Sequence, residues 1–185
     1  MKEVFFFESF NEKIFFSHVK KKFNFIQDNH SRSKKHILRG LHYQIKHPQD
    51  KLVRVSSGKV FDVIVDLRRS SSTFGKSFGI ELSAENKKQL FVPKGFAHGF
   101  LVLSEYADFQ YKTSDYYFPE YERVLLWNCK KLNINWPVKS PILNERDKNG
   151  LTPKALHNLL VKERPSLYED VLESEYSKLK VLTDE

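Results

Sequence analysis

Three residues between positions 39 and 51 are of types that together could abstract a proton and stabilise an oxyanion. His42 directly follows the segment Leu38-Arg39-Gly40-Leu41, and Lys51 lies nine residues further on. An imidazole can act as a general base, an ammonium can stabilise an oxyanion, and an arginine can bind an anion. In a regular strand Arg39 and His42 would face opposite sides, but a bend or bulge at Gly40 would turn both toward one pocket. The residue types alone leave a purely structural role open.

A second histidine, His98, lies in the segment PKGFAHG, three residues after a turn glycine and between two expected strands. This P-x-G-x-x-H pattern resembles the second motif of the cupin superfamily of small jelly-roll barrels. The first cupin motif supplies metal ligands as H-x-H with a downstream glutamate. Here it reads His42-Tyr43-Gln44, and no glutamate occurs before Gly58. Two imidazoles are too few for a metal site, so we expect neither a metal nor another cofactor. His98 alone is also compatible with a hydrogen-bonded histidine inside a barrel.

Two aspartates, Asp62 and Asp66, lie four positions apart in one expected strand, so their side chains share a face about 13 Å apart. That separation is too long for the carboxylate pair of a glycosidase. Asp66 precedes a turn, which favours a capping or salt-bridge role, whereas Asp62 could point into the barrel beside the histidines. Other chemistries are not indicated, because there is no G-x-S-x-G motif, Cys129 follows Trp127-Asn128 with no general base indicated nearby, and the seven glycines do not cluster.

The elements that must position these residues are short strands separated by turns. The strongest covers residues 59–67, whose sequence KVFDVIVDL is rich in β-branched residues. Further strands are expected over residues 24–29, 36–43, 51–55, 78–82, 89–92, 99–103, 107–113 and 124–127, and weak helical spacing occurs over residues 10–16. This many short strands argue for a sandwich or barrel rather than alternating β and α units. We therefore expect a mainly β, cupin-type jelly-roll barrel.

The length of 185 residues suits one ordinary domain with a short extension. We expect residues 1–150 to form the barrel domain and residues 151–185 to form a helical tail. Thr152-Pro153 is typical of a helix start, and leucines follow at helical spacing until Pro165. Ser166 and Glu169 then form a capping-box pair that opens a second helix.

Composition limits the possible functions further. The net charge is +8, and because residues 151–185 hold five basic and seven acidic residues, residues 1–150 carry +10. This excess suits an anionic ligand such as a phosphate ester or a nucleic acid, although a lysine-rich solvated surface would look the same. The single cysteine cannot form an internal disulfide, which favours a cytoplasmic protein. No stretch approaches the ~20 apolar residues of a membrane span, so no membrane partner is expected.

Longer segments of the chain resemble a known family in order and spacing. They are FFFESFN (5–11), FIQDNHSRS (25–33), LRGLHYQ (38–44), KLVRV (51–55), GKVFDVIVDLR (58–68), SSTFGK (71–76), LSAENKKQLFVPKGFAHGFLVLSEYADF (82–109), YKTSDYY (111–117), LLWN (125–128) and NINWP (133–137). Over about residues 4–148 the chain closely resembles the dTDP-4-dehydrorhamnose 3,5-epimerases. The resemblance implies a metal-free homodimer of cupin fold that acts on a dTDP-linked 4-keto-6-deoxy sugar and makes dTDP-4-dehydro-L-rhamnose for polysaccharide biosynthesis.

The resemblance also implies the roles of individual residues. His42 matches the base that removes the protons at C3 and C5, and Asp147 matches the aspartate that pairs with it. Lys51 matches the lysine that stabilises the enolate oxygen, and Tyr111 matches the acid that returns a proton on the opposite face of the sugar. Further matches bind the substrate: Phe6, Glu8, Gln27, Asp28, Asn29, Arg39, Asp62, His98, Tyr117, Glu122 and Arg146. Among these, Tyr117 matches a ring that stacks against thymine, and Phe6 matches an aromatic residue near the base.

The chain departs from the family pattern at both ends. The family usually begins with two further strands and a D-x-R-G turn whose arginine helps to bind the diphosphate; here Glu3 and Val4 stand at the arginine and glycine positions. We therefore expect a shortened N-terminal region. The segment beyond residue 150 is longer than the family core requires, and Cys129 replaces a common acidic residue.

Four alternatives remain beside the 3,5-epimerase. A 3-epimerase of a related keto sugar would share these motifs, and an inactive sugar-nucleotide-binding homologue would share most of them. A metal-dependent cupin oxygenase is disfavoured by Gln44. Nucleic-acid binding would rest on charge alone, so we expect no nucleic-acid partner.

Overall fold

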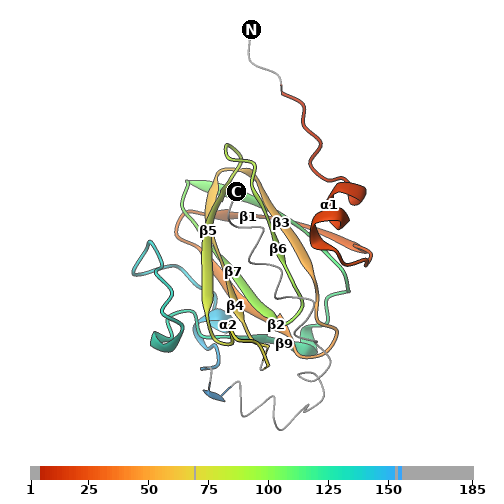
Figure 1. Cartoon of the computed structure of the whole chain (residues 1–185). Coiled ribbons are helices and arrows are strands. Elements are labelled where there is room, and N and C mark those ends of the chain that lie inside the picture. Colours follow the sequence, from red (N-terminus) through yellow and green to blue (C-terminus); the bar gives the residue numbers. More distant parts are fainter. Residues whose placement is uncertain (1–4, 69, 153, 156–185) are drawn as a thin grey trace.

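The computed structural model of the chain describes residues 5–68, 70–152, 154 and 155, and in these residues two antiparallel sheets form the fold (Figure 1). The four-stranded sheet has the order β1-β8-β3-β6, and the five-stranded sheet has the order β5-β4-β7-β2-β9. The strands are β1 (Gln27–Lys34), β2 (Leu38–Gln44), β3 (Lys51–Ser57), β4 (Lys59–Asp66), β5 (Ser77–Ser83), β6 (Gln89–Val92), β7 (Phe96–Val102), β8 (Tyr106–Thr113) and β9 (Glu122–Val124). The expected mainly β fold is therefore confirmed.

Two of the expected strands are misplaced for identifiable reasons. The first was expected over residues 24–29, but β1 begins at Gln27 and reads QDNHSRSK, with no β-branched residue to reveal it. It is a strand because all eight of its residues pair with β8. The last was expected over residues 124–127, but β9 ends at Val124; Leu125 still bonds to Leu41 of β2 and forms an isolated bridge to Leu151.

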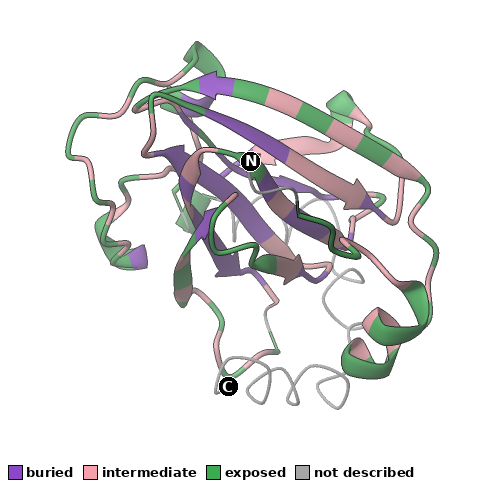
Figure 2. Cartoon of the chain, turned by 90° about the horizontal axis from the view of Figure 1, so that it is seen from above, coloured by how far each residue is buried: buried purple, intermediate pink, exposed green. Residues whose placement is uncertain are grey.

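Strand β4 is rich in hydrophobic residues because both of its faces are largely buried. Val60 and Ile64 point into the core between the two sheets, together with residues such as Phe100 and Phe109. Val63 and Val65 point to the other face of the five-stranded sheet, where Leu125 and Leu132 cover them. Figure 2 shows the resulting contrast between nearly continuous buried strands and strands that alternate between partly buried and exposed residues.

The helix indicated around residues 10–16 is present as α1 (Glu12–Val19). Asn11 caps its N-terminus by accepting the N–H of Ile14 at 3.1 Å, and Lys20 ends it in a left-handed conformation. Its Phe15 ring packs against Phe23, Phe25 and Phe91, which attaches the helix to β6. The aromatic run of the N-terminal region therefore anchors a helix outside the barrel.

The segment after β9 closes over the outer face of the five-stranded sheet. It contains the short 3₁₀ segment Lys130–Leu132 and the single-turn helix α2 (Glu145–Lys148), and a second 3₁₀ segment, Pro119–Tyr121, lies just before β9. The bridge between Ile37 and Ile142 holds this segment beside β2. At its end Thr152 accepts the N–H of Ala155 as expected of a helix cap, and the rest of the expected tail lies outside the described residues. No helix among the described residues is long and apolar enough to cross a membrane.

Candidate active site

A cavity of about 270 Å³ lies between the two sheets. Most of the residues expected at a site meet there. Those that line it are Gln27, Asn29, Arg39, His42, Lys51, His98, Tyr111, Tyr117, Glu122 and Arg146. They come from β1, β2, β3, β7, β8, β9, α2 and the loop before β9, so strands of both sheets build the cavity.

Gly40 explains how β2 presents both Arg39 and His42 to the cavity. Its φ of 124° is a conformation that glycine adopts readily and other residues rarely do. A Cβ at this position would also lie 2.6 Å from the Cα of Gly99, which is too close for a side chain. The pairing of β2 with β7 shifts register between Arg39 and His42. The bend expected from the sequence is therefore present. It brings Arg39 and His42, which would face opposite sides of a regular strand, to the same cavity.

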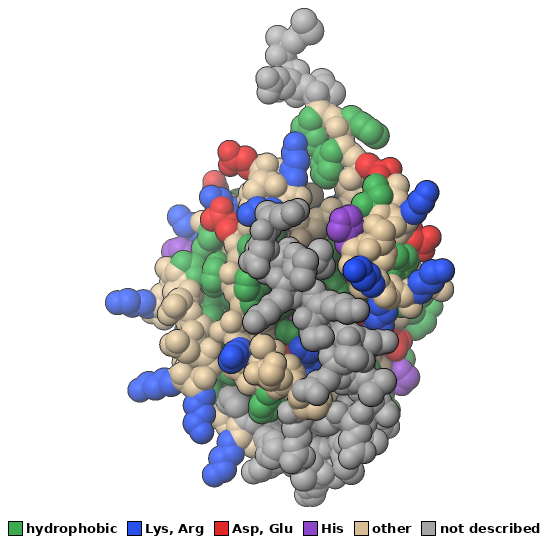
Figure 3. Space-filling model, viewed as in Figure 1, with side chains coloured by type: hydrophobic (Ala, Val, Ile, Leu, Met, Phe, Trp, Pro, Cys, Tyr) green, Lys and Arg blue, Asp and Glu red, His purple; other side chains and the backbone are tan. Residues whose placement is uncertain are grey.

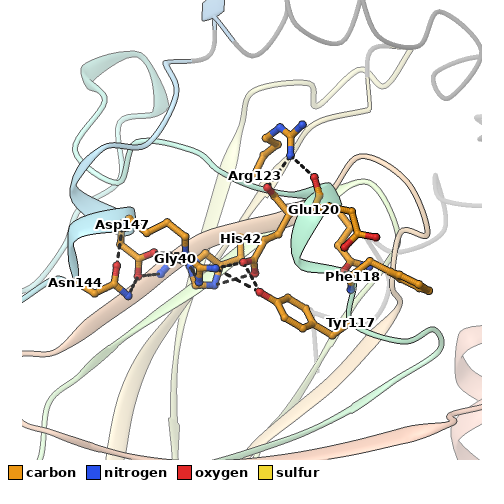
Figure 4. Close-up of polar contacts among 11 residues, drawn as sticks. Gly40, His42, Tyr117, Phe118, Glu120, Arg123, Asn144 and Asp147 are labelled. Carbon is orange, nitrogen blue, oxygen red and sulfur yellow. Dashed lines mark hydrogen bonds and ion pairs between the residues drawn. The ribbon is translucent and has the colours of Figure 1, made fainter.

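His42 is held by a buried carboxylate from α2. Its Nε2 lies 2.7 Å from Oδ1 of Asp147, whose Oδ2 accepts the N–H of Gly40 at 3.1 Å (Figure 4). Burial alone would raise the pKa of Asp147, but the bonds from His42 and Gly40, together with the Arg146 charge, lower it. An ionised Asp147 only accepts, so Nε2 of His42 carries a proton and donates it. In the neutral imidazole Nδ1 is then left with the free lone pair.

The residue that caps α2, Asn144, also holds Asp147 in position. Asn144 caps α2, because its Oδ1 accepts the N–H of Asp147 at 2.7 Å, and its Nδ2 donates to Oδ2 of the same residue at 3.2 Å. The cap fixes the backbone and the carboxylate of Asp147 together. A helix of one turn is sufficient for this purpose.

Lys51 and His98 line the cavity, and Asp62 lies behind His98, outside the lining. Nε2 of His98 lies 2.9 and 3.0 Å from the two carboxylate oxygens of Asp62, which is fully buried. Burial lowers the pKa of Lys51, while the charges of Glu122 and Asp62 act in the opposite direction. Asp62 thus points into the barrel, as the strand pattern allowed, and His98 is hydrogen-bonded there.

Tyr111 faces the cavity from the sheet opposite to His42. It lies on β8, paired with Asn29 of β1 and Val53 of β3, whereas His42 lies on β2. Burial and the charge of Glu122 raise the pKa of Tyr111, so its phenol is protonated at neutral pH. The cavity therefore has a proton acceptor on one wall and a proton donor on the other.

The mouth of the cavity is a linked set of polar side chains. The hydroxyl of Tyr117 donates to Oε2 of Glu122 at 2.9 Å, and Arg146 forms an ion pair with the same carboxylate. Arg146 also approaches the Tyr117 hydroxyl at 3.4 Å and Nε2 of His42 at 3.4 Å. Figure 4 shows His42 between Asp147 on one side and Tyr117 on the other.

Comparison with known proteins identifies the family of the chain. A sequence profile described as dTDP-4-dehydrorhamnose 3,5-epimerase matches residues 2–154. The chain belongs to this family. Relatives of that name from Shigella flexneri and Pseudomonas aeruginosa are 57% and 56% identical over 147 residues, which is 79% of this chain and 81% of each relative.

Solved structures of the family resemble the chain in fold. The dTDP-6-deoxy-D-glucose-3,5-epimerase of Legionella pneumophila, in complex with dTDP-4-keto-L-rhamnose, has a TM-score of 0.79 and 48% identity over 80% of both chains. A 3'-monoepimerase of Streptomyces bikiniensis, in complex with dTDP-quinovose, has a TM-score of 0.77 and 31% identity over 82% of this chain and 78% of that one. The family resemblance inferred from the sequence, and the isomerase class that it implied, are confirmed.

Three residues that match the family's binding positions lie away from the cavity. Phe6 is 95% exposed, and Glu8 is also exposed, on the N-terminal segment that extends away from the barrel (Figure 1). Figure 3 shows hydrophobic side chains gathered on this protruding part of the surface. Asp28 is exposed on the opposite face of β1 from Asn29, and it pairs with Lys112 at 3.0 Å.

The cavity also includes residues that the sequence did not single out as binding groups. These are Ser31, Tyr43, Gln44, Gln49, Gly99, Phe100 and Phe109. Strand alternation would have found some of them, since Ser31 lies two residues after Asn29 and Phe109 lies two before Tyr111. In the sequence, Gln44 stands at the second histidine position of the cupin H-x-H pattern, which indicates nothing about a binding role. The described residues hold no group of three or more His, Cys, Asp or Glu placed to bind a metal.

Asp66 has the structural role expected for it. Its carboxylate accepts hydrogen bonds from the Arg68 side chain at 2.9 and 2.7 Å, from Ser71 at 2.6 Å and from Thr73 at 2.6 Å. This bonding organises the turn after β4, outside the cavity.

Proposed function

We propose that the chain epimerises dTDP-4-dehydro-6-deoxy-D-glucose at C3 and C5 to give dTDP-4-dehydro-L-rhamnose. The observation that carries the proposal is the arrangement of proton-handling groups. The pair of His42 and Asp147 lies on one wall of the cavity, protonated Tyr111 lies on the other, and Lys51 lines the same cavity, where the charges of Glu122 and Asp62 favour its protonated form. Inversion at carbon needs removal of a proton on one face and its return on the other.

Each step follows from these groups. Nδ1 of His42 takes the proton from C3 or C5, which the neighbouring C4 ketone makes acidic, and the electron pair of the C–H bond moves into an enolate. Lys51 stabilises the charge on the enolate oxygen, and Asp147 stabilises the imidazolium. The Tyr111 hydroxyl then donates its proton to the carbon on the opposite face, which inverts the centre.

The remaining cavity residues suit a nucleoside diphosphate. Arg39 and Arg146 supply positive charge for the diphosphate, and the excess of basic residues before position 150 has the same sign. Tyr117 offers a half-exposed ring at the mouth for stacking on thymine. Gln27 and Asn29 line the wall between these groups.

We also propose a homodimer, in the cytoplasm, that serves polysaccharide biosynthesis. Phe6 and Glu8 support the dimer. They match family positions that bind the substrate, but in this chain they lie on an exposed segment away from the cavity of their own protomer. In a homodimer, these two residues could contact the substrate in the cavity of the second copy. The single cysteine supports a reducing compartment.

Incubation with dTDP-4-keto-6-deoxyglucose in heavy water tests the proposal. We expect deuterium at both C3 and C5 of the sugar, detected by mass and proton spectra, and no exchange at either carbon with His42→Ala. Deuterium at C3 alone would identify a 3-epimerase instead, an alternative favoured by the similarity to the monoepimerase of Streptomyces bikiniensis. No exchange by a folded protein that still binds dTDP would identify a binding homologue.

A further inference from the structure

A buried carboxamide at the end of β2 is bonded to the loop that carries Tyr117. Gln44 lies two residues beyond His42, and its side chain lines the same cavity. Its Nε2 donates to the carbonyl oxygens of His47 at 2.7 Å and Tyr116 at 3.3 Å, and its Oε1 accepts the N–H of Phe118 at 2.7 Å. A carboxamide has two hydrogens to donate and an oxygen to accept, so it satisfies all three backbone groups, whereas a carboxylate has no hydrogen to donate.

These bonds fall on both sides of Tyr117. One is to the residue before it, Tyr116, and one is to the residue after it, Phe118. Gln49 also bonds this loop, with Nε2 donating to the carbonyl oxygens of Asp115 at 2.8 Å and Tyr116 at 3.1 Å, but only on the N-terminal side. Gln44 therefore fixes the backbone on both sides of Tyr117.

Apart from its backbone, the Tyr117 side chain is held through its hydroxyl group. The residue is 46% exposed, and its hydroxyl bonds to Glu122 and Arg146, two side chains at the cavity mouth. Stacking on a base depends on the angle and height of the ring. With so little packing around the ring, both depend on where the backbone of the loop is held.

We propose that Gln44 is a positioning residue for nucleotide recognition, which holds the loop so that the Tyr117 ring covers the cavity mouth. The inference rests on the proposed function, in which Tyr117 stacks on thymine. Gln44 stands where the H-x-H pattern would have its second histidine. In this chain that position binds a loop.

A double-mutant cycle between Gln44 and Tyr117 tests the proposal. The dissociation constant of dTDP is measured by calorimetry for the wild type, Gln44→Glu, Tyr117→Ala and the double variant, and kcat and KM are measured for the dTDP-4-keto-6-deoxy sugar. We expect Gln44→Glu to raise the dissociation constant and KM about tenfold and to change kcat less than about threefold. In the Tyr117→Ala background the same change should have no further effect on dTDP binding.

Gln89→Glu is the matched control, because it changes the same atoms and removes a similar bond, from Nε2 to the carbonyl oxygen of Ser9, at an exposed site on β6. It should leave dTDP binding unchanged. If Gln44→Glu does not fold, Gln44→Met removes the polar atoms at nearly the same size without adding a buried charge. Wild-type dTDP affinity in a Gln44 variant, or a full additional loss in the double variant, would overturn the proposal. Failure of the wild type to bind dTDP would instead overturn the proposed function.

Discussion

Replacement of Asp147 by asparagine should inactivate the enzyme by moving one proton on His42. Oδ2 of Asp147 accepts hydrogen bonds from two donors, the N–H of Gly40 and Nδ2 of Asn144, whereas Oδ1 is hydrogen-bonded to His42 alone, with Nε of Arg146 further away at 3.7 Å. An asparagine has one oxygen, and two donors attract it more strongly than one. Its NH₂ group then points at Nε2 of His42, which must become the acceptor. The imidazole proton moves to Nδ1, and the base loses the lone pair that it needs.

The expected loss is large. The variant has the wrong tautomer and also lacks the negative charge that stabilises the imidazolium. We expect kcat to fall about 10³- to 10⁴-fold, or roughly 4–5.5 kcal/mol of barrier, by analogy with the loss known for the equivalent change in serine proteases. The dissociation constant of dTDP should change less than about threefold, because Asp147 is buried behind His42 and does not line the cavity.

Deuterium incorporation at C3 and C5 in heavy water measures the loss directly at both carbons. Asp147→Ala separates the two causes, since it removes the charge without presenting an NH₂ group to His42, and it should be no less active than Asp147→Asn. Asp108→Asn is the control: it neutralises a carboxylate that faces His30 at 3.5 Å and Arg32, away from the cavity. Exchange by Asp147→Asn within tenfold of the wild type would refute the tautomer argument.

Three further substitutions separate the other roles. Tyr111→Phe should keep some deuterium exchange at the sugar but return it with disturbed stereochemistry, which proton spectra of the product would reveal; clean inversion at wild-type rate would exclude Tyr111 as the acid. Lys51→Met should lower kcat about 10²- to 10³-fold with dTDP affinity retained, and a change confined to KM would exclude enolate stabilisation. Asp66→Asn should lower the free energy of unfolding at pH 7 by about 2–3 kcal/mol. Burial alone would raise the pKa of Asp66, but the bonds from Arg68, Ser71 and Thr73 lower it, so its stabilisation is present above about pH 4 and is lost as the pH falls through the lowered value. Urea unfolding should therefore show the two proteins converging in stability at low pH, and a constant difference would contradict this.

Strands buried on both faces were predictable from the sequence, and polar edge strands were not. In residues 59–67, residues with high β propensity occur on both faces of the expected strand, and β4 is found there. β1 has a sequence of polar residues, so only its partner β8 makes it a strand, and that pairing spans about 80 positions of the chain. Propensity is local, whereas an edge strand is defined by its neighbour.

The site was predictable in its residue types more than in its contacts. In a regular strand only one of the Arg39 and His42 side chains could face the cavity, so the intervening Gly40 indicated a bend. The bend is present. The pairing of His42 with Asp147 spans 105 positions, and no spacing rule could supply it; only the family resemblance did. The exposure of Phe6 could not be read from an aromatic run, which by itself suggests burial.

The distribution of the proton-handling groups over different elements has a consequence for how the site tolerates change. His42 belongs to the five-stranded sheet, Tyr111 to the four-stranded sheet, and Asp147 to a helix of one turn that packs beside β2. The sheets are joined by a shared hydrophobic core, so the distance between base and acid is fixed by packing. The tautomer of the base, in contrast, is fixed by α2 through the Asn144 cap and the N–H of Gly40. Small shifts of α2 should therefore alter the protonation of His42 before they alter the width of the cavity, because hydrogen bonds lose strength within tenths of an ångström while a packed core resists compression.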